Sequence, residues 1–201
     1  MRQTVFLLAA ACLGGAALTT AVSAPPMAQP PMEALGERLF FDVNLSANRT
    51  QSCATCHDPG YGFADPRGMA SPGDDGVSLG DRNAPTASYA AFTPPFHRNE
   101  AGEWIGGQFI DGRASTLEDQ AGGPPLNPIE MGMADEAAVV ARLREDPAYR
   151  EAFPALFGEG VLDDVEAAYD AMTRAIAAFE RDDLFAPFDS KYDRYLRGEG
   201  E

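Results

Sequence analysis

The clearest pattern of apolar and polar positions lies between about residues 163 and 180. Apolar side chains recur there every three or four residues, at Val165, Tyr169, Met172, Ile176 and Phe179. This spacing places them on one face of an α-helix, and the acidic residues Asp163 and Glu166 are typical of a helix N-terminus. We therefore predict a long amphipathic helix that begins near Asp163.

Shorter segments show the same helical spacing. The apolar positions are Leu35, Leu39 and Phe40 within Met32 to Phe41, and Val139, Val140 and Leu143 within Asp135 to Arg144. A further helix is expected at Ser115-Thr116-Leu117-Glu118, which has the sequence of a capping box. No stretch has a strand pattern of comparable quality, so we predict a mainly α fold.

Residues 58 to 95 are expected to form a long irregular segment. They are rich in Gly, Pro, Asp and Ser, with turn signals at Pro59-Gly60, Pro72-Gly73 and Asp75-Gly76. Loops of this length are uncommon in a compact domain unless they serve a function, such as wrapping a bound cofactor.

The charge of the chain limits its partners. The 201 residues carry a formal net charge of −16, which argues against nucleic acid or an anionic membrane as a partner. After the N-terminus no stretch approaches the ~20 apolar residues that a membrane span requires. Many exported proteins are acidic, so the charge says little about which protein partner is bound.

The N-terminus has the pattern of a secretory signal. Arg2 is followed by an apolar run from Val5 to Leu18 and then by small residues up to Ala24. We predict a signal peptide over 1–24, a Pro-rich tether over 25–32, one domain over 33–201, and a periplasmic location. Cys12 could instead be a lipid-modified cysteine, although Ala9 stands where a leucine is usual.

Residues 53 to 57 read Cys-Ala-Thr-Cys-His, the attachment motif of a c-type haem. Cys53 and Cys56, one helical turn apart, can add to the two vinyl groups of a porphyrin, and His57 can ligate the iron. A redox disulfide or half of a zinc site would also use two such cysteines. Neither explains His57, and beyond the motif and the signal peptide the chain offers zinc only His97. We therefore predict a cytochrome c-like helical domain with long Gly/Pro-rich loops around one covalent haem c.

The sixth position of the iron decides between electron transfer and peroxide chemistry. A methionine usually fills it in an electron carrier, and the candidates are Met69, Met131, Met133 and Met172. Each is equally plausible as a core residue, except that Met69 follows His57 too closely to reach the opposite face of the haem easily. His97 could be a ligand or a loop residue.

Further motifs occur in a fixed order along the chain. They are 35–42 (Leu-Gly-Glu-Arg-Leu-Phe-Phe-Asp), 52–57 (Ser-Cys-Ala-Thr-Cys-His), 82–86 (Arg-Asn-Ala-Pro-Thr), 111–114 (Asp-Gly-Arg-Ala), 120–121 (Gln-Ala), 127–131 (Asn-Pro-Ile-Glu-Met), 177–181 (Ala-Ala-Phe-Glu-Arg) and 188–192 (Phe-Asp-Ser-Lys-Tyr). Together they resemble the N-terminal, peroxidatic haem domain of the bacterial di-haem cytochrome c peroxidase family, which includes the methylamine-utilisation di-haem enzyme. The resemblance covers about residues 33 to 199.

The resemblance implies roles for several residues. Glu130 matches the catalytic glutamate, which would move a proton between the two oxygens of bound peroxide, and Gln120 matches a distal glutamine that would orient the peroxide. Asn83 matches a calcium-ligating asparagine, although a turn asparagine is an equal alternative. Arg113 could pair with a haem propionate or with a surface acid.

Three departures from the family change the expectation. A second Cys-X-X-Cys-His does not occur before the last residue, Glu201, and Ile110 replaces the tryptophan that commonly stands between the haems. Both predict poor electron supply within this chain. The loop over 66–76 has no histidine, which predicts an iron that is five-coordinate or water-ligated without reductive activation.

The sequence thus predicts a periplasmic peroxidase-type haem protein that reduces hydrogen peroxide. The electron donor would be a small cytochrome, a cupredoxin or a separately encoded second haem domain, and a homodimer is a further possibility. The chain could be a fragment of a longer di-haem protein. The alternatives are a monohaem electron-transfer cytochrome and a haem sensor or scaffold without turnover.

Overall fold

The computed structural model describes residues 32–199. The helices are α1 (Met32–Phe40), α2 (Cys53–Cys56), α3 (Leu117–Ala121), α4 (Gly123–Leu126), α5 (Glu136–Glu145), α6 (Pro147–Phe157), α7 (Val165–Phe179) and α8 (Lys191–Leu196). The strands are β1 (His97–Arg98) and β2 (Trp104–Ile105), which pair antiparallel. Short 3-10 turns occupy Val43–Leu45, Pro59–Tyr61, Ala90–Phe92, Val161–Asp163 and Asp183–Phe185.

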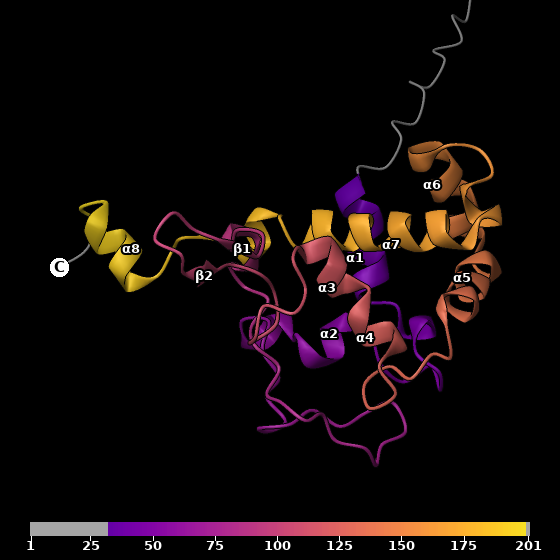
Figure 1. Cartoon of the computed structure of the whole chain (residues 1–201), viewed down its shortest axis with the longest axis horizontal. Helices are drawn as coiled ribbons and strands as arrows, with labels where there is room; N and C mark the ends of the chain where they lie inside the picture. Colours follow the sequence, from indigo (N-terminus) through magenta and orange to yellow (C-terminus); the bar gives the residue numbers. More distant parts are fainter. Residues whose placement is uncertain (1–31, 200–201) are drawn as a thin grey trace, which may run out of the picture.

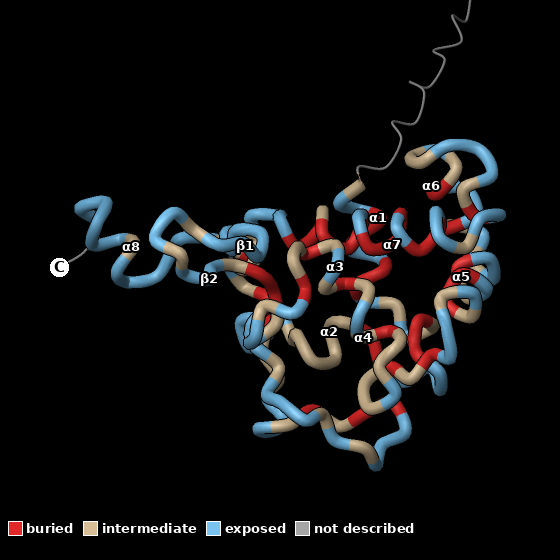
Figure 2. Tube along the Cα trace, viewed as in Figure 1, coloured by how far each residue is buried: buried red, intermediate tan, exposed pale blue. Residues whose placement is uncertain are grey.

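The long helix α7 runs through the body of the molecule, and α1, α3, α5 and α6 pack around it (Figure 1). Most of its residues are buried, in contrast to the exposed loops below it (Figure 2). As the apolar spacing predicts, Tyr169, Met172, Ile176 and Phe179 lie in the core. The mainly helical fold is confirmed.

The crossing of α1 over α7 depends on a glycine. A Cβ added to Gly36 would lie 1.9 Å from the carbonyl oxygen of Ala175 and 2.8 Å from Cβ of Phe179. Real side chains do not approach backbone this closely, so only glycine allows the two helices to come together here. This contact fixes α1 against the C-terminal half of α7.

A cluster of aromatic rings joins α1 and α7 to the loop that follows α2. Phe40 packs edge-on against Phe179 at 5.4 Å and Phe185 at 5.7 Å between centroids, and Phe63 stacks on Phe185 at 3.9 Å. Such pairs contribute stability beyond their buried area. The irregular segment after the Cys-X-X-Cys-His motif is therefore anchored to the helical core through Phe63.

The structure corrects several details of the sequence prediction. The N-cap of α7 is Asp164, one residue after the predicted start near Asp163, which belongs to the preceding 3-10 turn. The capping box of α3 is formed by Thr116 and Asp119 rather than by Ser115 and Glu118. Both shifts are one residue long, because several acidic and hydroxyl residues stand side by side and each could cap a helix.

Helix α6 and the hairpin were not predicted. Helix α6 contains Pro147 and Pro154, which usually mark helix ends. Strands β1 and β2 have two residues each, too few for an alternating pattern to be visible in the sequence. The predicted signal peptide over 1–24, Cys12 and residues 25–31 of the tether lie outside the described residues, whereas Met32 already belongs to α1.

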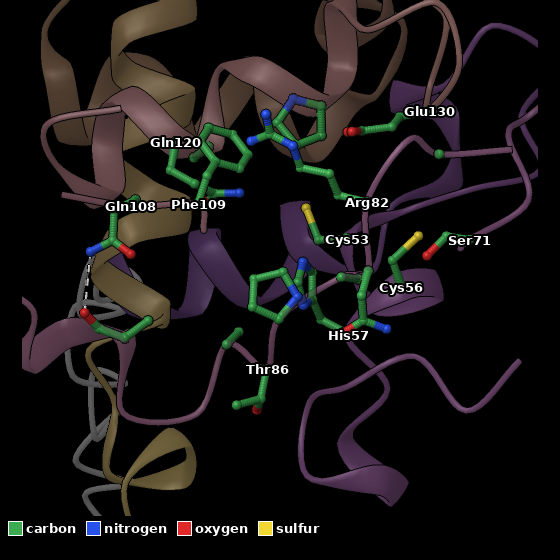
Figure 3. Close-up of a pocket in the computed structure, with 18 of the residues that line it drawn as sticks. Cys53, Cys56, His57, Ser71, Arg82, Thr86, Gln108, Phe109, Gln120 and Glu130 are labelled. Atoms are coloured by element: carbon green, nitrogen blue, oxygen red, sulfur yellow. Dashed lines mark hydrogen bonds between the residues drawn. The ribbon is translucent and has the colours of Figure 1, made fainter. Parts of the chain in front are cut away.

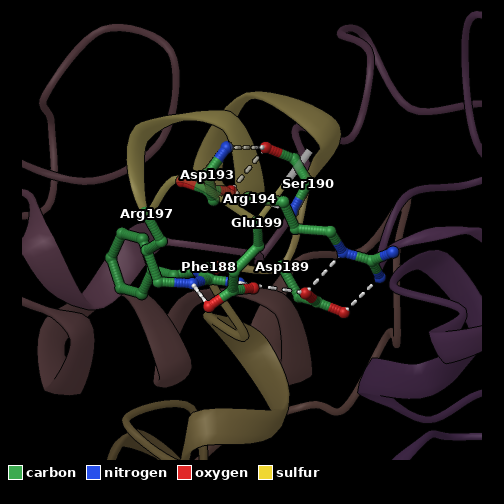
Figure 4. Close-up of polar contacts among 7 residues, drawn as sticks. All are labelled: Phe188, Asp189, Ser190, Asp193, Arg194, Arg197 and Glu199. Atoms are coloured by element: carbon green, nitrogen blue, oxygen red, sulfur yellow. Dashed lines mark hydrogen bonds and ion pairs between the residues drawn. The ribbon is translucent and has the colours of Figure 1, made fainter. Parts of the chain in front are cut away.

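The C-terminal helix α8 extends away from the body, next to the hairpin (Figure 1). Its polar contacts are local: Asp189 pairs with Arg194 at 2.6 Å and with Arg197 at 3.3 Å (Figure 4). Tyr192 and Tyr195 are 67% and 63% exposed. None of the helices within residues 32–199 is long and apolar enough to cross a membrane.

Candidate haem site

Helix α2 presents the predicted attachment residues to a single cavity. Its one turn begins at the N-cap Ser52, where Ser52 and Thr55 form a capping box, and ends at the C-cap His57. Cys53 and Cys56 are free thiols, and both line the cavity together with His57 (Figure 3). The structure thus brings together all the residues that a c-type haem requires of the protein.

The imidazole of His57 is oriented by the loop that follows it. Its Nδ1 lies 3.2 Å from the carbonyl oxygen of Phe63. A carbonyl oxygen can only accept a hydrogen bond, so Nδ1 carries the proton and Nε2 is left with a lone pair. Burial lowers the pKa of His57, which favours the neutral imidazole that ligates iron.

The thiols do not have the environment of a reactive dithiol. Burial raises the pKa of both Cys53 and Cys56, whereas redox-active and zinc-binding cysteines have lowered pKa values. No group of three or more His, Cys, Asp and Glu side chains within residues 32–199 is arranged to hold a metal ion. These observations favour thioether attachment over the zinc and disulfide alternatives.

The cavity beside α2 is open to solvent at its mouth and extends between residues of α2, of the irregular segment after it, of α3 and of α7. Most of the lining is apolar, with Ala87, Pro124, Met131 and Ile176 among its walls. The residues present therefore fit a covalently attached haem.

Glu130 and Gln120 lie across the cavity from His57 (Figure 3). The Glu130 carboxylate is half-buried, and its Oε1 accepts a hydrogen bond from Asn127 Nδ2 at 2.9 Å. Burial raises the pKa of Glu130 above that of an ordinary glutamate, against the opposing effects of Asn127 and Arg113. Both residues that the resemblance assigns to the distal side thus face the same space.

The loop that carries Glu130 is held from behind by the irregular segment. The backbone N–H of Asp74 donates to the carbonyl oxygen of Glu130 at 2.7 Å. The buried carboxylate of Asp74 accepts from the Asn48 N–H at 2.5 Å and from the Thr50 hydroxyl at 2.6 Å. Asp74 therefore connects three segments: the one before the haem motif, the one after it and the loop that carries Glu130.

Two arginines line the cavity and share one carboxylate. Arg113 pairs with Asp111 at 2.9 Å and lies over the ring of Phe109 at 3.6 Å, and Arg82 also contacts Asp111. The two guanidinium groups hold the pKa of Asp111 well below its usual range. Arg113 thus contacts a surface acid, and its pairing with a haem propionate stays a prediction.

The remaining candidates are placed as follows. Asn83 is exposed among the cavity residues, and its role as a calcium ligand stays a prediction. His97 is exposed in β1, bonded through Nδ1 to the Pro95 carbonyl at 2.7 Å, and it does not line the cavity. Of the four methionines only Met131 lines the cavity; Met69 is 88% exposed, and Met133 and Met172 are core residues.

Several cavity residues have no role predicted from the sequence, and Arg82, Phe109 and Glu180 are among them. Arg82 and Glu180 stand in motifs that carry the resemblance, and Phe109 stands outside these motifs. Glu180 is 5% exposed and lines the cavity; its position beside Arg181 resembles a surface ion pair, and nothing in the sequence reveals its burial.

Comparison with known proteins agrees with this geometry. Methylamine utilization protein MauG of Paracoccus denitrificans is 57% identical over 203 residues, which cover 96% of this chain and 52% of the relative. Cytochrome c peroxidase Ccp of Escherichia coli is 40% identical over 166 residues, 83% of this chain and 31% of the relative. The chain thus spans about half or less of the length of these curated relatives.

The crystal structure of the diheme peroxidase BthA from Burkholderia thailandensis has the same fold. It superposes with a TM-score of 0.78 and 37% sequence identity, over 83% of this chain and 42% of that chain. The family model described as di-haem cytochrome c peroxidase matches residues 30–201. Membership implies haem c as the cofactor, in accord with the cavity around α2. The chain belongs to the di-haem cytochrome c peroxidase family.

Proposed function

We propose that this chain binds one haem c in the cavity and reduces hydrogen peroxide to water with electrons from a redox partner. The observation that carries the proposal is the pair Glu130 and Gln120, which faces His57 across the cavity (Figure 3). A distal carboxyl and amide provide acid–base chemistry and orientation, which a simple electron carrier does not need.

The chain holds the haem through three residues. Cys53 and Cys56 would form the thioether bonds, and Nε2 of His57 would ligate the iron, because Nδ1 donates to the Phe63 carbonyl. When bound, the haem supplies a redox-active iron at which peroxide is reduced. The hydrogen bond to the Phe63 carbonyl would hold the half-buried imidazole in the orientation that leaves Nε2 free for the iron.

Glu130 would move the proton that cleaves the peroxide. The reaction consumes one peroxide, two electrons and two protons and yields two waters. The carboxylate would take a proton from one oxygen of the peroxide and return it to the other, so that water can leave. The burial that raises the pKa of Glu130 makes it a better base, and Asn127 fixes its direction. The Gln120 amide would hold the peroxide by a hydrogen bond.

The electrons would come from outside the described residues. The chain spans about half of its relatives, and Ile110 stands where the resemblance expects an aromatic residue. Exposed aromatic residues, including Trp104 (65% exposed) and Tyr192 (67% exposed), mark the end of the molecule that carries β2 and α8. Exposed apolar surfaces of this kind favour protein partners. We propose a second haem-bearing domain, a small cytochrome or a cupredoxin as the donor. In the alternative, a second copy of this chain covers the exposed aromatic residues in a homodimer.

The cellular setting follows from the N-terminal pattern and the cofactor. We propose export by residues 1–24 to the periplasm, where thiols and haem can be joined, and 33–201 as the haem domain. If calcium binds at Asn83, the amide oxygen would supply one of the roughly six to eight ligands that calcium takes.

A monohaem electron-transfer cytochrome is the second candidate. Met131 is buried, lines the cavity and follows Glu130 directly. If its sulfur closed the sixth position, peroxide could not reach the iron.

Substitution of Glu130 separates the two candidates. The whole chain is matured with haem in a bacterial periplasm, and peroxide consumption is measured with a reduced c-type cytochrome as donor. We expect Glu130→Gln to lower turnover by roughly 10²-fold, while Glu136→Gln, an acid on α5, leaves it unchanged. Equal turnover of the Glu130 variant and the parent protein would refute the proposal.

A further inference from the structure

Glu180 is a buried carboxyl group at the wall of the haem cavity to which the reaction above gives no role. It is the C-cap of α7 and is 5% exposed. It lines the cavity together with Cys53 and Ile176. A titratable group in this position is close to the cofactor yet shielded from solvent.

One oxygen of the carboxyl group, Oε2, is buried and has no hydrogen-bond partner among residues 32–199. The neighbouring cation, Arg181, is paired with Glu118 at 2.8 Å instead. The C-terminal end of a helix also disfavours a negative charge. An unpaired carboxylate is costly in such surroundings, so the neutral acid is favoured.

Three charged or titratable groups face Glu180 from the surrounding elements. Arg181 follows it in the chain, Glu118 lies on α3 and Cys53 on α2. Burial raises the pKa of Glu180 to about 8, Arg181 opposes this effect and Glu118 adds to it. Glu180 and Cys53 line the same cavity, so the carboxyl group shares this space with the attachment point of the haem. A pKa of about 8 means that the protonation state of Glu180 changes near neutral pH.

We propose that Glu180 is a proton-coupling residue, which takes up a proton when the haem is reduced and releases it when the haem is oxidised. The inference rests on the haem assignment of the proposed function. Where Glu180 is ionised in the oxidised protein, at pH values near and above 8, one electron from the redox partner would reduce the haem and one proton from solvent would convert the Glu180 carboxylate to the acid. The net charge of the buried site then stays constant.

The coupling follows from electrostatics at low dielectric. An electron added to the haem repels the negative charge of a buried carboxylate and so raises the pKa of the carboxyl group. The carboxylate in turn repels the electron and so lowers the midpoint potential of the haem. The two effects are equal by linkage. In a one-electron couple that takes up one proton per electron, the midpoint potential falls by up to about 59 mV for each tenfold fall in proton activity. A tenfold fall in proton activity is a rise of one pH unit.

The test is a spectroelectrochemical titration of the haem-loaded chain between pH 6 and pH 10, bracketing the pKa of Glu180 of about 8. We expect the midpoint potential of the parent protein to fall with rising pH above this value. Glu180→Gln, which keeps the shape but cannot ionise, should remove that slope. Glu166→Gln, at an exposed acid on the same helix, should retain it. Parallel titrations of the parent and Glu180→Gln would overturn the inference.

If Glu180→Gln does not take up haem, a second measurement tests the inference. The redox difference infrared spectrum is recorded near pH 8 on Glu130→Gln, so that the distal carboxyl cannot contribute. Reduction should produce a protonated-carboxyl band that shifts in heavy water; its absence would overturn the inference. Neither measurement uses peroxide, so failure of peroxide reduction and failure of proton coupling are separate outcomes.

Discussion

The Nδ1 of His57 lies 3.2 Å from the carbonyl oxygen of Phe63, and the ring of Phe63 stacks on Phe185 at 3.9 Å. The residue that orients the iron ligand is thus anchored in the aromatic core. Phe63 also has a φ of 58°, an uncommon value for a residue that is not glycine. The packing of its ring therefore fixes both the loop and the direction of the imidazole.

Phe63→Ala should destabilise the fold and loosen the iron ligand. Removing a buried aromatic ring costs about 3–5 kcal/mol, and Phe63 is 4% exposed. Denaturant unfolding measures the loss. The control is Phe92→Ala, at a ring that is 64% exposed, which should change stability far less. Similar losses for the two variants would show that the stacking does not anchor the loop.

Gly36→Ala should destabilise the protein, contrary to the usual effect of this change in a helix. Inside a helix, replacing glycine by alanine normally stabilises the folded state by about 0.5–1 kcal/mol. Here its Cβ would collide with the Ala175 carbonyl, and overpacking of this kind costs roughly 1–3 kcal/mol or more. Thermal unfolding should show a lower midpoint, whereas Glu37→Ala, on the exposed side of α1, should not. A raised midpoint for Gly36→Ala would contradict the close crossing of α1 and α7.

Asn127→Leu should shift the pH dependence of peroxide turnover. The hydrogen bond from Asn127 favours the ionised form of Glu130 and lowers its pKa, while burial raises it. Glu130 must be ionised to accept a proton, so activity is lost as pH falls through its pKa. Without the hydrogen bond this acidic limb moves to higher pH, and below the limb the rate falls about tenfold per pH unit. An unchanged limb would mean that another group controls it.

Met131→Leu distinguishes the two candidate functions. This exchange conserves volume and should cost less than about 1.5 kcal/mol. If the iron has an open sixth position, the ferric spectrum and peroxide turnover should both be retained. Conversion from a low-spin to a high-spin ferric spectrum in the variant would identify Met131 as a ligand and favour the electron carrier.

The sequence predicted the parts of this protein that depend on local patterns. The apolar spacing of α7 and the Cys-X-X-Cys-His motif of α2 each reside within a few helical turns, where residue order determines geometry. The resemblance selected Gln120 and Glu130, and both line the cavity. Their roles remain predictions until activity is measured.

What the sequence did not predict depends on long-range packing. Glu180 is next to Arg181 in the chain, but Arg181 pairs with Glu118 on α3, and this leaves Glu180 buried alone. The sharing of Asp111 by Arg82 and Arg113 joins loops 29 residues apart. Neither arrangement has a local signal, because each arises only when separate segments meet around the cavity.

The central claim is that the haem of this chain has an open distal side served by Glu130. The most direct test is the optical and EPR spectrum of the haem-loaded ferric protein before and after addition of hydrogen peroxide. The account predicts a high-spin ferric signal and a rapid peroxide-dependent spectral change, which Glu130→Gln slows by roughly 10²-fold. A low-spin spectrum that does not respond to peroxide would mean that two strong ligands hold the iron and would contradict the account.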